Sequence, residues 1–259
     1  MIVQSRRAAI KSLGMSALAL AFVKTGLCES AFPGHVNELS SWLNRVQQNA
    51  VQLSNREISS LQWQEAIDRI YERTPLTELK ELLRFDDLRR HILEKIPANR
   101  DELFQTIRLE TPNVPHQKNG SEPRRELITK IAHVKKGQSI PPHGHSNMVS
   151  AFLCLSGEFE VRQFDRLDDR VEHLVVRSSL HEKSAGPGTW SSISDYRDNV
   201  HWLTAKTDDC FLFTCKLLRI EEGKPLQGRI NIDLRDAKML GLNTYQAPKI
   251  SASRAREIY

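Results

Sequence analysis

The sequence predicts a mainly β protein, an antiparallel sandwich or small barrel that follows an N-terminal helical segment. From His35 to about Ile96, apolar residues recur at spacings of three and four, which is the period of a helix. After Arg125 the period changes to two, in short β-rich runs separated by Gly, Pro, Asp and Ser. Eight such runs with no helix among them are typical of a two-sheet sandwich or a small barrel. The runs are residues 126–134, 148–156, 158–164, 171–178, 189–194, 200–206, 210–218 and 229–234.

These patterns divide the chain into four segments. Residues 1–30 form a targeting segment and residues 31–124 form the helical preface with a linker. Residues 125–240 form the β-domain, and residues 241–259 form a C-terminal tail. The linker is recognised by its prolines and glycine in a polar stretch, where the helical period ends.

Residues 1–30 have the pattern of a signal peptide. A basic start containing Arg6 and Arg7 precedes an apolar run from Leu13 to Val23, which is shorter than the roughly 20 residues that span a bilayer. The arginine pair is similar to the twin-arginine (Tat) export signal, and an ordinary secretion signal with two arginines is the alternative. We expect a bacterial protein exported to the periplasm or out of the cell, with no integral membrane span.

Net charge and cysteine content limit the function classes. Of the formal charge of +5, residues 1–30 contribute +3, so the remainder carries only +2 and its basic residues alternate with acids. Binding to nucleic acid is therefore not expected. Beyond the signal segment the cysteines are Cys154, Cys210 and Cys215, an odd number that excludes a disulfide framework as the basis of the fold. One bridge remains possible, and buried free thiols are the expectation.

A histidine pair marks the candidate site, in GQSIPPHGHSNMVSAFLCLSG at residues 137–157. Residues two apart on a strand face the same side, so His143 and His145 can approach the same metal ion. A polar turn between two strands is the other interpretation of the pair. His201, in DNVHWLTAK, belongs to a later run of the same β-domain and is the candidate for a third ligand.

The spacing of these residues resembles the cupin family. Gly137, five residues, the His-x-His pair and then Gly157 are similar to the first cupin motif, and His201 after Asn199 is similar to the second. The resemblance covers about residues 125–235 and implies a cupin domain, an RmlC-like jelly roll or double-stranded β-helix that binds a metal. Many cupins have a glutamate ligand four or five residues after the second histidine.

This chain has Val149 and Ser150 at those positions. Cupins without that glutamate include the thiol dioxygenases, and residues 140–165 resemble a segment of the cysteamine dioxygenase and plant cysteine oxidase group. The resemblance implies that His143, His145 and His201 hold non-haem iron(II), with zinc, manganese or nickel as alternatives. A small-molecule thiol and O₂ would be the substrates, and a sulfinate the product. Three neutral ligands leave the full charge of the metal for an anionic thiolate.

The chain also departs from these relatives. No tyrosine stands between His201 and Tyr245 to form the cysteine-tyrosine crosslink of mammalian cysteine dioxygenases, and TCKLLRIEEG replaces the Pro-Pro-Tyr of cysteamine-type enzymes. The interpretation leans toward an oxidoreductase of the thiol dioxygenase type. Two other functions stay open. One is a non-catalytic cupin that binds a metal or ligand, and the other is a zinc or manganese cupin isomerase or lyase.

Two further residues are candidates for the site. Ser150 occupies the position of the missing carboxylate ligand, so we expect it to face the barrel cavity. Asp198 precedes His201 and can hydrogen bond to the ring nitrogen that faces away from the metal, because metal-bound imidazole usually donates its other N–H to a partner. A turn-forming acid is the alternative interpretation of Asp198.

Overall fold

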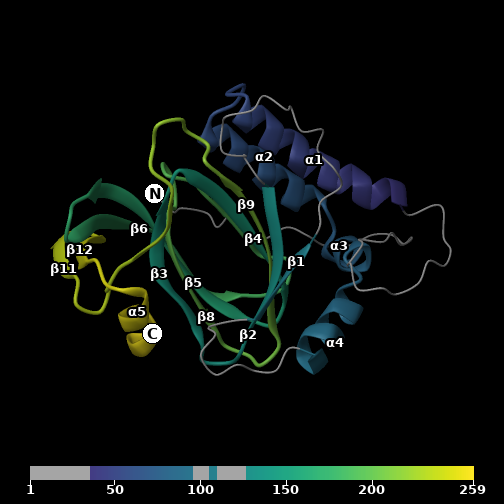
Figure 1. The fold of residues 1–259 in the computed structure, drawn as a ribbon. Helices are drawn as coiled ribbons and strands as arrows, with labels where there is room; N and C mark the ends of the chain where they lie inside the picture. The colour runs from purple at the N-terminus through teal and green to yellow at the C-terminus, as the bar shows by residue number, and fades with distance from the viewer. Residues whose placement is uncertain (1–35, 96–104, 110–126) are drawn as a thin grey trace.

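The computed structural model describes residues 36–95, 105–109 and 127–259. Figure 1 shows a two-sheet β-domain with helices α1 and α2 beside the sheet that contains β4 and β9. The predicted signal peptide at residues 1–30 and most of the predicted linker lie outside the described residues. Within the described ranges, no helix is long and apolar enough to cross a membrane.

The described part of the helical segment contains four helices, where the period of three and four predicts them. Helix α2 begins with a capping box, in which the Ser59 hydroxyl accepts from the Gln62 amide and the Gln62 side chain accepts from the Ser59 amide. The bounds are α1 Val36–Ser54, α2 Ser60–Arg73, α3 Leu76–Leu82 and α4 Phe85–Lys95.

Two antiparallel sheets form the β-domain. The five-stranded sheet has the order β1-β2-β9-β4-β7, and the seven-stranded sheet has the order β10-β3-β8-β5-β6-β12-β11. The bounds are β1 Gln105–Leu109, β2 Leu127–Val134, β3 Ser139–Ser146, β4 Met148–Ser156, β5 Phe159–Asp169, β6 His173–Ala185, β7 Trp190–Ile193, β8 Val200–Ala205, β9 Cys210–Leu218, β10 Gln227–Asn231, β11 Lys238–Gly241 and β12 Thr244–Pro248. The predicted fold class, a mainly β domain of two antiparallel sheets after an N-terminal helical segment, is confirmed.

The central strands of the five-stranded sheet, β4 and β9, are buried on both faces. Along β4 and β9, alternate residues such as Val149 and Phe213 pack in one core with the helices, and Trp42 of α1 meets Phe213 edge-on at 5.4 Å between ring centroids. The residues between them, such as Phe152 and Leu212, pack in a second core between the sheets. Two-sided burial explains why these strands read as nearly continuous apolar runs. Cys154, Cys210 and Cys215 are buried and free, as expected.

The chain returns to the β-domain at its C-terminal end. The segment predicted as a tail from residue 241 contains β12, which pairs with β6, and α5 (Ala252–Ile258). The outer face of β8 meets this end of the chain, where the rings of Trp202 and Tyr259 are 4.9 Å apart. His201, next to Trp202, faces the opposite way, into the space between the sheets.

Candidate metal centre

Strands β3 and β8 bring the three histidines together. His143 is the cross-strand partner of His201, and His145 lies two residues further along β3, on the same face. Ile140 packs in the core between the sheets although it is an odd number of residues from His143. A β-bulge between Ile140 and His143 changes the alternation of β3 and so turns both side chains inward.

The three imidazoles converge on one point in the barrel interior. One ligand nitrogen from each of His143, His145 and His201 lies within 4.8 Å of the others. The ring centroids are 4.3 Å apart for His143 and His201, 4.8 Å for His143 and His145, and 5.2 Å for His145 and His201. All three side chains are buried. This group can hold a metal ion.

Each ring directs its Nδ1 atom to a backbone carbonyl. His143 Nδ1 lies 2.7 Å from the oxygen of Pro141, His201 Nδ1 lies 3.4 Å from that of Asn199, and His145 Nδ1 bonds the oxygen of Gly228. A neutral imidazole that donates from Nδ1 keeps its lone pair on Nε2.

The Nε2 atom of His145 provides a test of whether a metal fits. It is buried and has no hydrogen-bond partner among the described residues. A buried polar atom without a partner is costly, and coordination to a metal would satisfy it. In metal-binding histidines, the ring nitrogen that does not face the metal also usually donates to an acceptor such as a backbone carbonyl. The residues present therefore fit a divalent metal.

Electrostatics keep the three rings neutral. Burial lowers the pKa of His143 and His145 well below its usual value and that of His201 to about 3. Positive charge on Lys216 lowers the pKa of His145 and His201 further, and Arg229 acts in the same direction on all three rings. In the described part of the chain, no carboxylate is among the groups that shift these pKa values. The rings are thus in the unprotonated form that metal binding requires.

A buried polar network supports the loop before β8. The Asp195 carboxylate, 1% exposed, lies 2.5 Å from the Lys224 ammonium and accepts from the Asn147 amide at 2.8 Å. Asn147, which has a φ of 62°, donates from its side chain to the carbonyls of Glu221 and Lys224. These bonds fix the start of β4 against the segment between β9 and β10, at the end of the barrel where the histidines lie.

The structure places Ser150 and Asp198 differently with respect to the histidines. Ser150 is buried on the face of β4 that points between the sheets, since its neighbours Val149 and Ala151 pack with the helices. The Asp198 carboxylate accepts from the Ser179 hydroxyl at 2.5 Å. A contact between Asp198 and the His201 ring stays a prediction.

Two interior residues were not singled out from the sequence. Lys216 on β9 is the cross-strand partner of Ser150, and Gln163 on β5 is the cross-strand partner of His201. Both face the space between the sheets. The signal for Lys216 was present, because it is the one charged residue in the apolar run CFLFTCKLL at residues 210–218. Gln163 stands in an ordinary alternating strand that gave no such signal.

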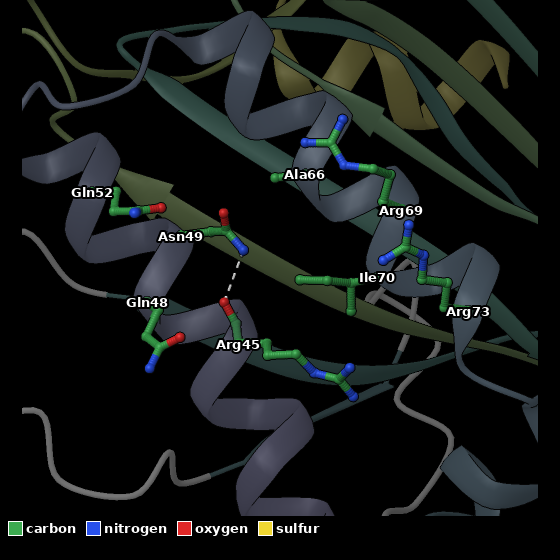
Figure 2. A pocket seen from close by; sticks show the side chains of 8 residues that line it. All are labelled: Arg45, Gln48, Asn49, Gln52, Ala66, Arg69, Ile70 and Arg73. Atoms are coloured by element: carbon green, nitrogen blue, oxygen red, sulfur yellow. Dashed lines mark hydrogen bonds between the residues drawn. The ribbon is translucent and has the colours of Figure 1, made fainter.

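A surface groove lies elsewhere, between α1 and α2. It has a volume of about 280 Å³. Figure 2 shows the side chains of Arg45, Arg69 and Arg73 around it and the hydrogen bond from Asn49 to the carbonyl of Arg45. Because α1 and α2 cover the outer face of the five-stranded sheet, this groove is separate from the histidines. Its lining residues are Arg45, Gln48, Asn49, Gln52, Ala66, Arg69, Ile70 and Arg73.

Parts of this chain are similar to several solved structures. KdgF from Halomonas sp. is 13% identical with a TM-score of 0.31, over 47% of this chain and 91% of its own. A recombinant oxalate oxidase in complex with glycolate is 16% identical with a TM-score of 0.28, over 38% of this chain and 45% of its own. A structure reported with DMSP lyases is 14% identical with a TM-score of 0.27, over 39% of this chain and 44% of its own.

This chain thus spans less than half the length of the oxalate oxidase and DMSP lyase chains. No protein-family model matches the sequence. No curated protein matches it either. What the site can do chemically therefore rests on its own residues.

Proposed function

We propose that this protein is a metal-dependent cupin that binds iron(II) through His143, His145 and His201 and oxidises a small thiol to a sulfinate with O₂. The observation that supports it most is the ligand set. Three neutral imidazoles meet at one point, and the position where many cupins carry a glutamate is Ser150. A metal held this way keeps its full positive charge for an anionic substrate.

When bound, iron(II) would supply a Lewis-acidic centre at which a thiolate and O₂ can meet. The overall reaction, RS⁻ + O₂ → RSO₂⁻, balances without a protein nucleophile or an external reductant. The residues of this chain have three tasks. The carbonyls at each Nδ1 hold the rings in one tautomer, the core between the sheets excludes water, and Lys216 adds positive charge to the site.

The test begins with the metal content of the purified full-length chain. The protein is reconstituted anaerobically with iron(II), and O₂ uptake is then followed with 3-mercaptopropionate, cysteine and cysteamine. We expect uptake of one O₂ per thiol and a product 32 Da heavier than the thiol, as a sulfinate requires. Iron-loaded protein that consumes no O₂ with any thiol contradicts the proposal and favours a binding protein. Bound zinc or manganese with turnover of a sugar or acid favours an isomerase or lyase.

The His201→Gln variant tests the ligand assignment separately. Losing one of three ligands should lower iron retention after gel filtration by at least about tenfold. The matched control is His181→Gln, because His181 is on β6, bonds Glu160 at 2.8 Å and lies outside the three-histidine group. If both variants keep the iron of the wild type, the three-histidine assignment is wrong.

A further inference from the structure

We propose that Lys216 forms an anion subsite beside the three histidines, so that the substrate is a thiol carrying a carboxylate or sulfonate and not an amine. This inference deepens the proposed function and rests on it for the thiol. The anion subsite itself is inferred from the side chains between the two sheets, and binding of an anion there can be measured without catalytic turnover. The resemblance to cysteamine-type enzymes, taken alone, favours a thiol substrate that carries an amine.

The strand alternation of β9 points Lys216 between the sheets. Its neighbours Cys215 and Leu217 pack in the core with the helices. Cys210 and Leu212, an even number of residues away, pack in the core between the sheets. Lys216 therefore shares the interior face, where its partner across the β4 pairing is Ser150.

Among the described residues, the Lys216 ammonium has no partner of opposite charge. In the part of the chain that the structure describes, no hydrogen bond or ion pair to it is found, and Lys216 is only partly exposed. A lysine in such a position is costly unless a counter-charge accompanies it. The charges that act on it most, Arg229 and Lys130, are positive as well. An anionic ligand would supply what this site lacks.

Gln163 adds a free donor on the opposite sheet. Its Oε1 accepts from the Ser191 hydroxyl at 2.7 Å, which leaves its Nε2 buried without a partner among the described residues. Gln163 is 1% exposed and stands beside His201 across the β5–β8 pairing. An unused amide donor next to the metal ligands calls for an oxygen acceptor on the bound molecule.

Charge balance leads to the same class of ligand. A divalent metal would add two positive charges to that of Lys216 in a region where no described carboxylate acts on the three rings. A thiolate offsets one charge, and an acid group on the same molecule offsets a second. Cysteamine would bring an ammonium group instead, which Lys216 repels.

Binding to the zinc-loaded full chain tests this without redox chemistry. Calorimetric titrations compare 3-mercaptopropionate, 2-mercaptoethanesulfonate and cysteamine. We expect either or both acids to bind at least about tenfold more tightly than cysteamine, which is the difference that one charge-assisted hydrogen bond makes. Tight binding of only one acid identifies the carboxylate or the sulfonate as the group recognised. Cysteamine that binds as tightly as both acids contradicts the proposal.

Three variants separate the charge from the fold. Lys216→Met should weaken binding of the acids at least about tenfold, while Lys216→Arg should keep it within about threefold, because arginine retains the charge. Lys136→Met, in the exposed turn before β3, is the matched control and should bind as the wild type does. Wild-type affinity for the acids in Lys216→Met would overturn the proposal. If acids bind through Lys216 but iron-loaded protein takes up no O₂, the subsite stands and only the dioxygenase function fails.

Discussion

The side chain of Asn199 holds both backbone polar groups of His145. Its Oδ1 accepts from the His145 amide at 3.2 Å, and its Nδ2 donates to the His145 carbonyl at 3.1 Å. The same residue offers its own carbonyl to the His201 ring. One asparagine thereby sets the position of two of the three histidines, on two different strands.

Replacing Asn199 by alanine should therefore affect stability and metal binding together. We expect the free energy of unfolding to fall by about 2–4 kcal/mol, because buried backbone groups lose their partners. Iron affinity should fall by about tenfold or more. Urea unfolding and competition with a chelator measure the two effects. Asn49→Ala on α1, which loses one bond to a helix carbonyl, is the control, and equal iron affinity in both variants would contradict this role.

Gly144 has no room for a side chain. A Cβ atom there would lie 2.6 Å from Asn199 Oδ1 and 3.1 Å from Val200 Cγ2. Gly144→Ala should thus destabilise the protein by about 1–3 kcal/mol and loosen the metal site, since Asn199 must move. Gly186→Ala is the control, because a Cβ at Gly186 meets nothing within 4 Å. Equal melting temperatures for the two variants would show that the clash is relieved at no cost.

Acid should destabilise the metal-free protein. The folded pKa of His201 is about 3, below the ordinary value of 6.5, so between these values the unfolded chain binds more protons than the folded one. Stability is then lost as the pH falls from about 6.5 toward 3. We expect the melting temperature of the wild type to be well below its pH 7 value at pH 5. The difference between the two melting temperatures should be smaller in His201→Gln. An unchanged difference would mean that His201 does not titrate on unfolding.

Lys216 should lower the free energy of unfolding of the protein without metal or ligand. Burial lowers its pKa to about 8 from 10.5, so the cost of holding the charge is present below pH 8 and fades as the pH rises toward 10.5. Lys216→Met should raise the free energy of unfolding by roughly 1–3 kcal/mol at pH 7, and the gain should shrink above pH 8. Chemical denaturation at pH 7 and pH 10 measures this. A destabilised variant at pH 7 would contradict the prediction.

Much of the fold could be predicted from periodicity. The eight alternating runs correspond to β2 and to strands β4 to β10. Strand β3 was not among them, because Pro141, Pro142 and Gly144 are typical of a turn. In the structure these residues are tolerated by a bulge and by the tight approach of Asn199 to Gly144. Strands β1, β11 and β12 are short, four or five residues each, and carry little periodicity.

The histidines were recognisable because the His-x-His spacing and the histidine in a later strand can each be read within a short stretch of sequence. The other residues around the site cannot be found in this way. Gln163 and Lys216 reach the site from different sheets, and only the register of β5 with β8 and of β9 with β4 shows that they face it. Asn199 was noted as a motif position, but its hold on His145 is a contact over 54 positions in sequence. No pattern within a single strand encodes such a contact.

All three histidines come from the seven-stranded sheet, whereas Lys216 comes from the five-stranded one. A metal would consequently connect strands within one layer and would not itself link the two layers. A molecule bound to the metal at one end and to Lys216 at the other would link the two sheets. Substrate, more than metal, would then lock the layers together, and the barrel would be at its most rigid only while it is occupied.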